Sequence, residues 1–386
     1  MPWSTSGVLR SDRKASWAPI LALASGIATL VASEFLPASV LPTMAADIGV
    51  SEGRAGLAVA ATAVAGAATA PTIALLFPRT DRRRLLVGLL AVATLSDLSV
   101  ALAPGFGVLL VARLLLGAAI AGYWSFAFGA GTRARPGRDH VVSTALATGV
   151  SVATVVGVPL AAAVGDAVDW RVVFLGAAGL TAVSTAAVAA SVPPVVAHPG
   201  AGLAMLRGAV GNRRLMAGIV GVVLVVFGNF AAYPYIRIAI GDVAAAGTAW
   251  FLLAWGVGGL VGNVAAGAVS SRLRPATAAA PVLLAAGLGL AAVAPSVALL
   301  GVAVIVWGFA FNMVPVLTQL WVTRVEPQHA ESALALQVTA FQVAIALGAA
   351  VGGSIVDGYD VHGALLVGAA CAGLSGCIFA LLRLTR

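Results

Sequence analysis

The chain has few charged residues for its length. Asp, Glu, Lys and Arg together make up 9% of its 386 residues, whereas a soluble domain carries about 25% of such residues. Hydrophobic residues make up 61%, and the mean hydropathy is +1.04. These values exclude a water-soluble core and predict an integral membrane protein whose surface faces mostly lipid.

The sequence also lacks the residue patterns of common enzymes. It contains no Walker loop, so we do not expect ATP to drive it directly. Cys371 and Cys377 fall on one predicted helix and face different sides, so we expect no disulfide. The histidines are scattered over loops without metal-ligand spacing, and no Ser-His-Asp arrangement is present. We therefore predict a protein that is not an enzyme and uses no metal and no cofactor.

Apolar runs account for nearly the whole chain. A transmembrane helix needs about 20 mostly apolar residues, so 386 residues fit about twelve spans with short loops. We predict an all-α fold whose twelve transmembrane helices are Trp17–Pro42, Gly53–Phe77, Leu85–Ala103, Phe106–Gly129, His140–Val164, Trp170–Val192, Leu215–Ile238, Ala246–Ser270, Pro275–Ala294, Val297–Val322, Glu331–Ile355 and Gly363–Leu384.

The basic residues sort to one side of these spans. That side collects Arg10, Arg13, Lys14, Arg79, Arg82, Arg83, Arg84, Arg133, Arg135, Arg138, Arg207, Arg213, Arg214, Arg272, Arg274, Arg324, Arg383 and Arg386. The other side has Arg54 and Arg171, with Arg237 near its boundary, and most of the loop acids. Because Lys and Arg mark cytoplasmic loops, we predict a multi-pass protein with both termini in the cytoplasm. The net charge of +8 is explained by these loops, so we expect no nucleic-acid partner.

A polar, Pro-rich connection divides the chain near its middle. Six predicted spans precede residues 193–214 and six follow them. This layout is typical of a duplicated six-helix unit. We predict an N-terminal bundle over residues 1–192, a cytoplasmic linker over 193–214 and a pseudo-symmetric C-terminal bundle over 215–386. Pairs of small residues such as Gly258 and Gly262 favour close helix packing.

One acid lies inside the first apolar run. Glu34 is the only charged residue between Trp17 and Thr43. A carboxylate at the centre of a lipid-spanning helix costs about 2.5–3.5 kcal/mol on insertion scales, so Glu34 has to face protein or water. Pro37 and Pro42 remove backbone donors and can leave carbonyls free beside it. We interpret Glu34 as a proton or substrate site; a structural acid bonded to a neighbouring helix is the alternative.

Two further charged residues fall inside predicted spans. Asp97 lies in the third span. Three interpretations are open: it lines the same cavity as Glu34, it pairs with Arg113, or it lies near the membrane face. Arg113 lies in the fourth span. Its fixed positive charge can stabilise a nearby carboxylate, or its side chain can extend to the membrane interface.

Several stretches together resemble the major facilitator superfamily, in particular the drug/proton antiporter branch with the arabinose-efflux-like and purine ribonucleoside efflux permeases. These stretches are SEFLPASVLPTMAADIGVSEGRAG (Ser33–Gly56), TDRRRLLVG (Thr80–Gly88), ARLLLGAAIAGYW (Ala112–Trp124), DWRVVF (Asp169–Phe174), YPYIR (Tyr233–Arg237) and IVWGFAFNMVPVLTQLWVTR (Ile305–Arg324). The chain departs from the superfamily's loop pattern at Phe77 and Arg84, which occupy two glycine positions. It also has Gly157-Val158-Pro159 where the antiporter pattern has adjacent Gly and Pro.

The resemblance implies a fold and a mechanism. It implies two six-helix bundles around a central cavity in a bacterial inner membrane, and export of a small organic solute, such as a purine nucleoside or a drug, in exchange for protons. It identifies Arg113 with the superfamily's arginine in the fourth helix. It also implies that Asp81, with Arg82, is a conformational latch between the bundles; positive-inside topology alone explains the arginines but not Asp81.

Aromatic and amide side chains in the spans are the candidates for solute contact, since they offer stacking faces and hydrogen bonds. Each of them can instead hold helices together or lie at the membrane interface. The candidates, with Arg237 at the end of the seventh span, are Tyr123, Trp124, Asn229, Tyr233, Arg237, Trp255, Asn263, Trp307, Asn312, Gln337 and Gln342.

The sequence as a whole predicts a monomeric, proton-coupled exporter whose partners are a small-molecule substrate, protons and the lipid bilayer. Glu34, Asp97 and Arg113 are the predicted proton-coupling residues. A proton-coupled importer or a facilitator of the same fold remains open. A non-transporting membrane sensor would need a soluble signalling domain, for which the chain has no room. A membrane-embedded enzyme would need a cluster of His, Asp or nucleophilic residues, and the sequence shows no such cluster.

Overall fold

The structure is a computed structural model that describes residues 17–194, 211–244 and 247–382. Its described residues form helices and turns, without a strand. Twelve helical segments in these ranges are long and apolar enough to cross a membrane. The predicted all-α, twelve-span fold is therefore confirmed.

The first half of the chain, residues 17–194, supplies six of these segments. Its elements are α1 (Ala18–Ile48), α2 (Glu52–Leu76), α3 (Arg82–Ala101), α4 (Phe106–Ala134), α5 (Asp139–Val152), a π-turn (Ala153–Gly157), α6 (Val158–Ala167) and α7 (Trp170–Ser191). The segments α5, π-turn and α6 together make the fifth span.

The second half, residues 211–382, supplies the other six. Its elements are α9 (Arg213–Ala232), a 3₁₀ turn (Tyr233–Tyr235), α10 (Ile236–Ala244), α11 (Thr248–Ala268), a 3₁₀ turn (Ser270–Arg272), α12 (Leu273–Ala292), α13 (Val297–Val325), a 3₁₀ turn (Pro327–His329), α14 (Ala330–Gly358) and α15 (Val361–Leu381). The segments from α9 to α10 make the seventh span.

Several helices begin at a polar residue that satisfies their free amide groups. Ser51, Asp81, Asp169 and Asp360 each accept a hydrogen bond from a backbone N–H in the first turn of α2, α3, α7 and α15. Asn212 does the same for α9. Such N-caps are worth about 0.5–2 kcal/mol each, which explains why these helices start beside the loop acids and amides.

The prolines interrupt helices without ending them. The predicted end of the first span at Pro42 is wrong, because α1 runs through Pro37 and Pro42 to Ile48 with a kink at Val40 (φ −125°, ψ 15°). A proline removes only one backbone donor, and the kink relieves the steric clash of its ring. Gly49 ends α1 in the left-handed region (φ 72°), which favours glycine.

Two other spans are broken beside a proline. The π-turn lies just before Pro159 in the fifth span, and the 3₁₀ turn Tyr233–Tyr235 contains Pro234 in the seventh. Because proline has no N–H, the helical ladder is open at both places. The seventh span therefore changes from α-helix to a 3₁₀ turn at residues 233–235, where the two halves meet.

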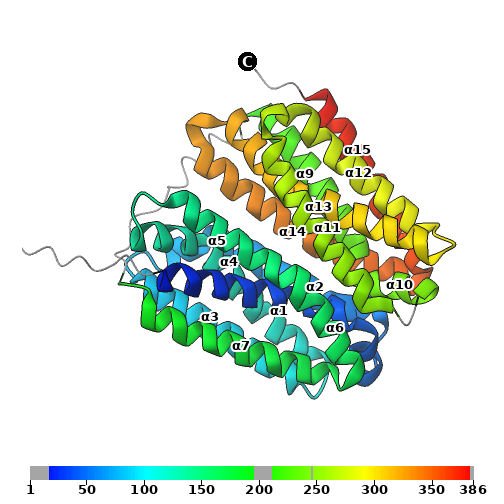
Figure 1. The fold of residues 1–386 in the computed structure, drawn as a ribbon, viewed down its shortest axis with the longest axis horizontal. Helices are drawn as coiled ribbons and strands as arrows, with labels where there is room; N and C mark the ends of the chain where they lie inside the picture. Colours follow the sequence, from blue (N-terminus) through cyan, green and yellow to red (C-terminus); the bar gives the residue numbers. More distant parts are fainter. Residues whose placement is uncertain (1–16, 195–210, 245–246, 383–386) are drawn as a thin grey trace, which may run out of the picture.

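The helices form two groups that meet at three places. Figure 1 shows helices α1–α7 on one side and helices α9–α15 on the other. Contacts between the groups run between α2 and α14, between α11 and the α6 and π-turn segment, and between α1 and the 3₁₀ turn and α10 of the seventh span. The predicted linker falls largely on residues 195–210, which lie outside the described residues, and the predicted bundle boundaries stay a prediction.

Glycines allow the helices to approach closely, as predicted from their spacing. A Cβ atom at Gly258 or Gly262 of α11 would collide with the carbonyl oxygens of Ile305 or Phe309 in α13. The seam between the halves uses the same device, because a Cβ at Gly53 of α2 would meet the backbone of α14. Interfaces of this kind depend on van der Waals packing between backbones.

Candidate functional site

A buried arginine holds the broken part of α1. Arg113 of α4 is 0% exposed. Its Nη1 donates to the Ser33 carbonyl (2.8 Å), its Nη2 to the Glu34 carbonyl (3.0 Å) and its Nε to the Ala58 carbonyl of α2 (3.3 Å). The Ser33 carbonyl lies four residues before Pro37, so it is the one that the missing proline N–H would have bonded. The prediction that this proline leaves a free carbonyl beside Glu34 is confirmed.

Two acids lie beside this arginine. Glu34 is half-buried, and Arg113 and Glu34 are within electrostatic range of one another. Asp97 of α3 is fully buried and also within range of Arg113, and its Oδ2 accepts a hydrogen bond from Ser33 Oγ (2.7 Å). The Asp97 Oδ1 atom has no hydrogen-bond partner. We call Ser33, Glu34, Asp97 and Arg113 the charge cluster.

The charge cluster holds unequal numbers of acidic and basic groups. Glu34 and Asp97 are two carboxyl groups, whereas Arg113 is the one guanidinium in range of both. In a medium of low dielectric constant an uncompensated charge is costly, so one arginine balances only one of two carboxylates. The second carboxyl group is therefore a place where a proton can be gained or lost.

An aromatic cluster lies opposite, in the second half of the chain. The Tyr233 ring centroid is 4.7 Å from that of Trp255 in α11 and 6.4 Å from that of Trp307 in α13. Trp307 Nε1 donates to Asn229 Oδ1 (2.8 Å). Each of these four side chains is at most 1% exposed. The structure thus brings together four of the eleven predicted substrate-contact residues.

The two clusters meet across the boundary between the halves. Phe35, next to Glu34 on α1, packs its ring against Tyr233 with a centroid distance of 5.2 Å. Glu34 is within electrostatic range of Tyr233. A charge change at Glu34 is therefore felt directly by the aromatic cluster of the other half.

Ion pairs and hydrogen bonds join the halves at the end of the helices that carries most of the acids, here called the acidic end. Arg237 of α10 donates to the Ser39 carbonyl of α1 (2.6 Å) and to both carboxylate oxygens of Asp166 in α6 (2.7 and 2.8 Å). Asp357 of α14 accepts from Ser51 Oγ (2.6 Å) and from the backbone N–H of Gly53 in the first turn of α2 (2.9 Å). Tyr235 Oη donates to the Gly53 carbonyl at the same end (3.3 Å). We call these contacts of Arg237 and Asp357 the polar lock. Arg237, which was predicted to contact substrate, is part of it.

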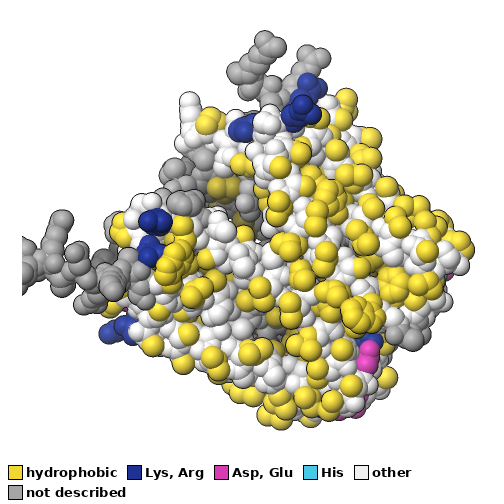
Figure 2. All heavy atoms as spheres, viewed as in Figure 1, with side chains coloured by type: hydrophobic (Ala, Val, Ile, Leu, Met, Phe, Trp, Pro, Cys, Tyr) yellow, Lys and Arg dark blue, Asp and Glu magenta, His cyan; other side chains and the backbone are white. Residues whose placement is uncertain are grey.

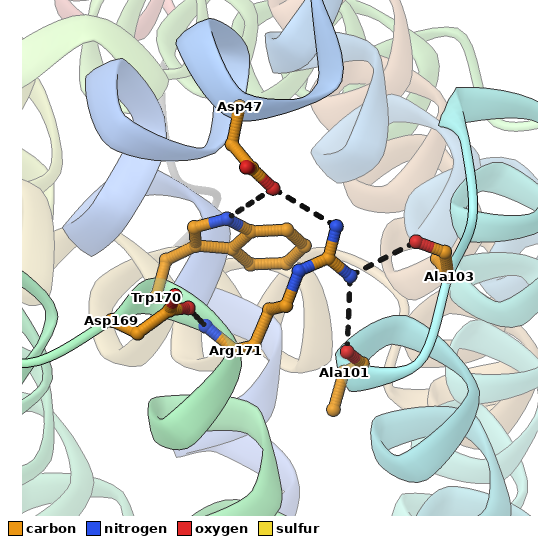
Figure 3. A network of polar contacts seen from close by, with 6 residues as sticks. All are labelled: Asp47, Ala101, Ala103, Asp169, Trp170 and Arg171. Atoms are coloured by element: carbon orange, nitrogen blue, oxygen red, sulfur yellow. Dashed lines mark hydrogen bonds and ion pairs between the residues drawn. The ribbon is translucent and has the colours of Figure 1, made fainter.

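A second polar network at the acidic end stays within the first half. Asp47 at the end of α1 accepts from Trp170 Nε1 (3.1 Å) and from Arg171 Nη2 (2.9 Å), as Figure 3 shows. Arg171 Nη1 donates to the carbonyls of Ala101, the last residue of α3, and of Ala103 just after it. The DWRVVF stretch therefore fastens α7 to α1 and α3 and does not bridge the halves.

The predicted latch residues lie at the opposite end of the helices. Figure 2 shows most of the Arg side chains of the visible face at this basic end, and the acids at the other. Asp81 Oδ1 accepts from the Arg84 N–H (3.0 Å), and Arg82 Nη1 donates to the Phe77 carbonyl (3.0 Å). Phe77 has φ −123°, so the loop does not need the glycine that the superfamily has there. A hollow of about 600 Å³ beside Asp81 is lined by Arg83 and Arg84, and no residue of either cluster is part of its lining.

The other candidates make hydrogen bonds outside the two clusters or have partly open positions. Tyr123 Oη donates to the Leu23 carbonyl (3.3 Å) inside the first half. Gln337 Nε2 donates to Thr318 Oγ1 (2.7 Å), and Asn312 Nδ2 donates to the carbonyl one turn earlier in α13. Three candidates have partly open positions: Trp124 is 43% exposed, and Asn263 and Gln342 are half-buried.

Ser33, Asp166 and Asp357 were not among the predicted site residues. Asp166 and Asp357 appeared only as loop acids, and Ser33 as part of the SEFLP stretch. Asp357 is separated from its partner Ser51 by 306 positions, and no local pattern signals such a pair.

Comparison with known proteins is consistent with these features. The chain matches the Major Facilitator Superfamily over residues 21–349. It is 33% identical over 375 residues to the purine ribonucleoside efflux pump NepI of Salmonella enteritidis PT4 (strain P125109), covering 96% of this chain and 93% of that protein. It is also 33% identical over 352 residues to NepI of Salmonella typhimurium (strain LT2), covering 90% and 89%.

Solved structures share the fold at low sequence identity. A mutant of the nucleoside transporter NupG superposes with a TM-score of 0.77 at 12% identity, over 95% of this chain and 100% of that one. The human organic anion transporter MFSD10 (TETRAN) superposes with a TM-score of 0.67 at 16% identity, over 94% and 98%. The chain is therefore a multi-pass membrane transporter, not an enzyme, and it belongs to the Major Facilitator Superfamily.

Proposed function

We propose that this transporter exports a purine ribonucleoside or a similar small organic solute in exchange for protons. The observation that carries the proposal is the position of Glu34, a half-buried acid in a proline-broken helix, between Arg113 and the aromatic cluster of the other half. An intramembrane acid in such a position is by default a functional group. The relatives named as purine ribonucleoside efflux pumps support the solute and the direction.

The charge cluster suggests how the two fluxes are coupled. With Glu34 and Asp97 both ionised the cluster carries one excess negative charge, and one proton removes it. Solute that enters the aromatic cluster disturbs Tyr233, which feels the charge of Glu34. In this proposal, solute and proton compete for the same arrangement of α1, so that binding of one favours release of the other.

The position of the polar lock suggests which state the structure represents. By the positive-inside rule the basic end faces the cytoplasm, which places both termini there and the acidic end outside a bacterial inner membrane. The halves are hydrogen-bonded to each other at the acidic end. This supports a state closed to the outside, and export requires the Arg237 and Asp357 contacts to separate. Asp81 and Arg82 keep the proposed role of a latch for the opposite state, and the working unit in this proposal is a monomer.

Transport of labelled inosine into vesicles that contain the purified protein tests the proposed coupling. An antiporter lets protons leave an acidic lumen and draws solute in, so we expect inosine to accumulate when the lumen is more acidic than the medium. A symporter would instead expel inosine under the same gradient, and a facilitator would equilibrate it without regard to pH. Either of these results would exclude proton antiport.

Breaking the Arg237–Asp166 ion pair is expected to open the acidic end. The variant Asp166→Asn removes the charge that holds Arg237, whose own side chain is 9% exposed. We expect pulsed EPR to show longer distances between spin labels at the exposed positions Val168 and Tyr359, after replacement of both native cysteines by serine.

The matched control for this experiment is Asp47→Asn. It breaks the Asp47–Arg171 pair, which joins elements of the first half only. We expect its label distances to equal those of the parent protein. If Asp166→Asn also leaves the distances unchanged, the ion pair does not hold the halves together.

A further inference from the structure

The aromatic cluster contains three polar atoms that are buried and have no hydrogen-bond partner. They are Asn229 Nδ2, Tyr233 Oη and Trp255 Nε1. Asn229 and Tyr233 lie one helical turn apart, and the Tyr233 ring packs on that of Trp255. A buried polar group without a partner costs free energy, and such groups in native proteins are rare. Three of them in one packed cluster, which Asn229 joins through Trp307, indicate a site that accepts hydrogen-bonding groups from a ligand.

The Trp307 indole fixes which way the Asn229 amide points. An indole N–H only donates, so the Asn229 atom 2.8 Å from Trp307 Nε1 has to be the carbonyl oxygen Oδ1. The amide NH₂ group is therefore left without a partner. Trp255 Nε1 is likewise a donor only, and the Tyr233 hydroxyl can donate as well. The cluster thus offers N–H and O–H donors and needs acceptors from its ligand.

A purine base matches this set through one of its edges. A base with an oxygen at position 6, as in guanine, has two adjacent acceptors, O6 and N7. Adenine has the N7 acceptor beside the N6 amino group, which is a donor. The flat faces of Tyr233, Trp255 and Trp307 also suit a planar heterocycle, since aromatic side chains stack on the face of any base.

We propose that Asn229, Tyr233 and Trp255 form the subsite that recognises the heterocycle of the solute, and that this subsite prefers 6-oxopurine nucleosides over 6-aminopurine nucleosides. The inference rests on the proposed export of purine ribonucleosides and adds its specificity. The preference follows because an amino group facing these donors leaves at least one of them without an acceptor. Trp307 positions the subsite by holding the Asn229 amide in its orientation.

Binding of inosine and adenosine to the purified full-length transporter tests this specificity. The variants Tyr233→Phe and Trp255→Phe each remove one donor and keep an aromatic ring. We expect the parent protein to bind inosine about tenfold more tightly than adenosine in isothermal titration, as one well-placed pair of base contacts allows. In each variant we expect the inosine affinity to fall until this ratio approaches one, with the adenosine affinity little changed.

Matched controls are available on the same chain. Trp250 lies in α11, five positions before Trp255, and is 74% exposed, while Tyr359 is 87% exposed. Trp250→Phe and Tyr359→Phe should leave both affinities as in the parent protein. Melting temperatures measured on all five proteins show whether a lost affinity reflects unfolding; because two independent variants remove different donors, the test does not depend on one of them folding.

The outcomes separate this inference from the proposed function. If the parent protein binds nucleosides but favours neither base, or if both variants keep the tenfold ratio, the donor subsite is wrong and nucleoside export still stands. If the parent protein binds no nucleoside, the proposed solute class fails, and the subsite fails with it.

Discussion

Vesicles that contain the Glu34→Gln variant are expected to accumulate no inosine in response to an acidic lumen. Glutamine has nearly the same size as glutamate and can fill the same space, but it cannot release or bind the transported proton. Glu34 carries the proposed exchange because it is the half-buried acid that lies within range of both Arg113 and the aromatic cluster. Accumulation should fall to the level of protein-free vesicles while the melting temperature stays near that of the parent protein.

Glu326→Gln is the matched control for this variant. Glu326 is also a half-buried glutamate, but it follows α13 at the basic end, where it accepts a hydrogen bond from Asn212 Nδ2 (2.7 Å). Its replacement should preserve accumulation. If both variants accumulate inosine as the parent protein does, Glu34 is a structural acid and the coupling group has to be sought elsewhere, with Asp97 next.

Replacement of Arg113 is expected to have the second large effect, on both stability and transport. Arg113→Met keeps the length of the apolar stem but removes three hydrogen bonds to the carbonyls of Ser33, Glu34 and Ala58. It also leaves the buried Asp97 and the half-buried Glu34 without a positive charge beside them. Removing one partner of a buried charged group costs about 3–5 kcal/mol, so we expect a clearly lower melting temperature and loss of pH-driven inosine accumulation.

Two comparisons separate the roles of Arg113. Arg113→Lys keeps the charge but cannot bond three carbonyls at once, so we expect its stability and transport to lie between those of the parent and Arg113→Met. Arg171→Met removes an arginine that also bonds two carbonyls, but its side chain is 32% exposed and lies at the acidic end. We expect a smaller loss of stability there, since water and salt weaken exposed pairs. Equal losses for Arg113 and Arg171 would contradict a special role for the charge cluster.

Much of the fold could be predicted from the sequence because a membrane imposes simple rules. Every span has to be a long apolar helix, and the loops between spans carry the arginines and acids. Pro37 predicted that a backbone carbonyl beside Glu34 is left without its helical hydrogen bond. Arg113 donates a hydrogen bond to this carbonyl, which is that of Ser33. The positions of the helix breaks were harder to predict from the sequence. A proline can end a helix or kink it, and only the packing around Val40 and Pro234 decides which.

The pairings that make the site could not be predicted in the same way. Ser33 bonds Asp97 across 64 positions, and Arg237 bonds Asp166 across 71. Such pairs depend on how the helices are arranged in space and leave no mark on the local pattern. For the same reason the aromatic and amide candidates formed one undivided set in the sequence, whereas the structure selects Asn229, Tyr233, Trp255 and Trp307 as neighbours.

The most direct test of the coupling mechanism follows protons instead of solute. Purified parent protein and Glu34→Gln are placed in vesicles with a pH indicator in the lumen, without an imposed gradient, and inosine is added outside. If Glu34 carries the exchanged proton, the parent protein will make the lumen more alkaline as inosine enters, and Glu34→Gln will leave the lumen pH unchanged. An equal proton flux through both proteins would contradict the account.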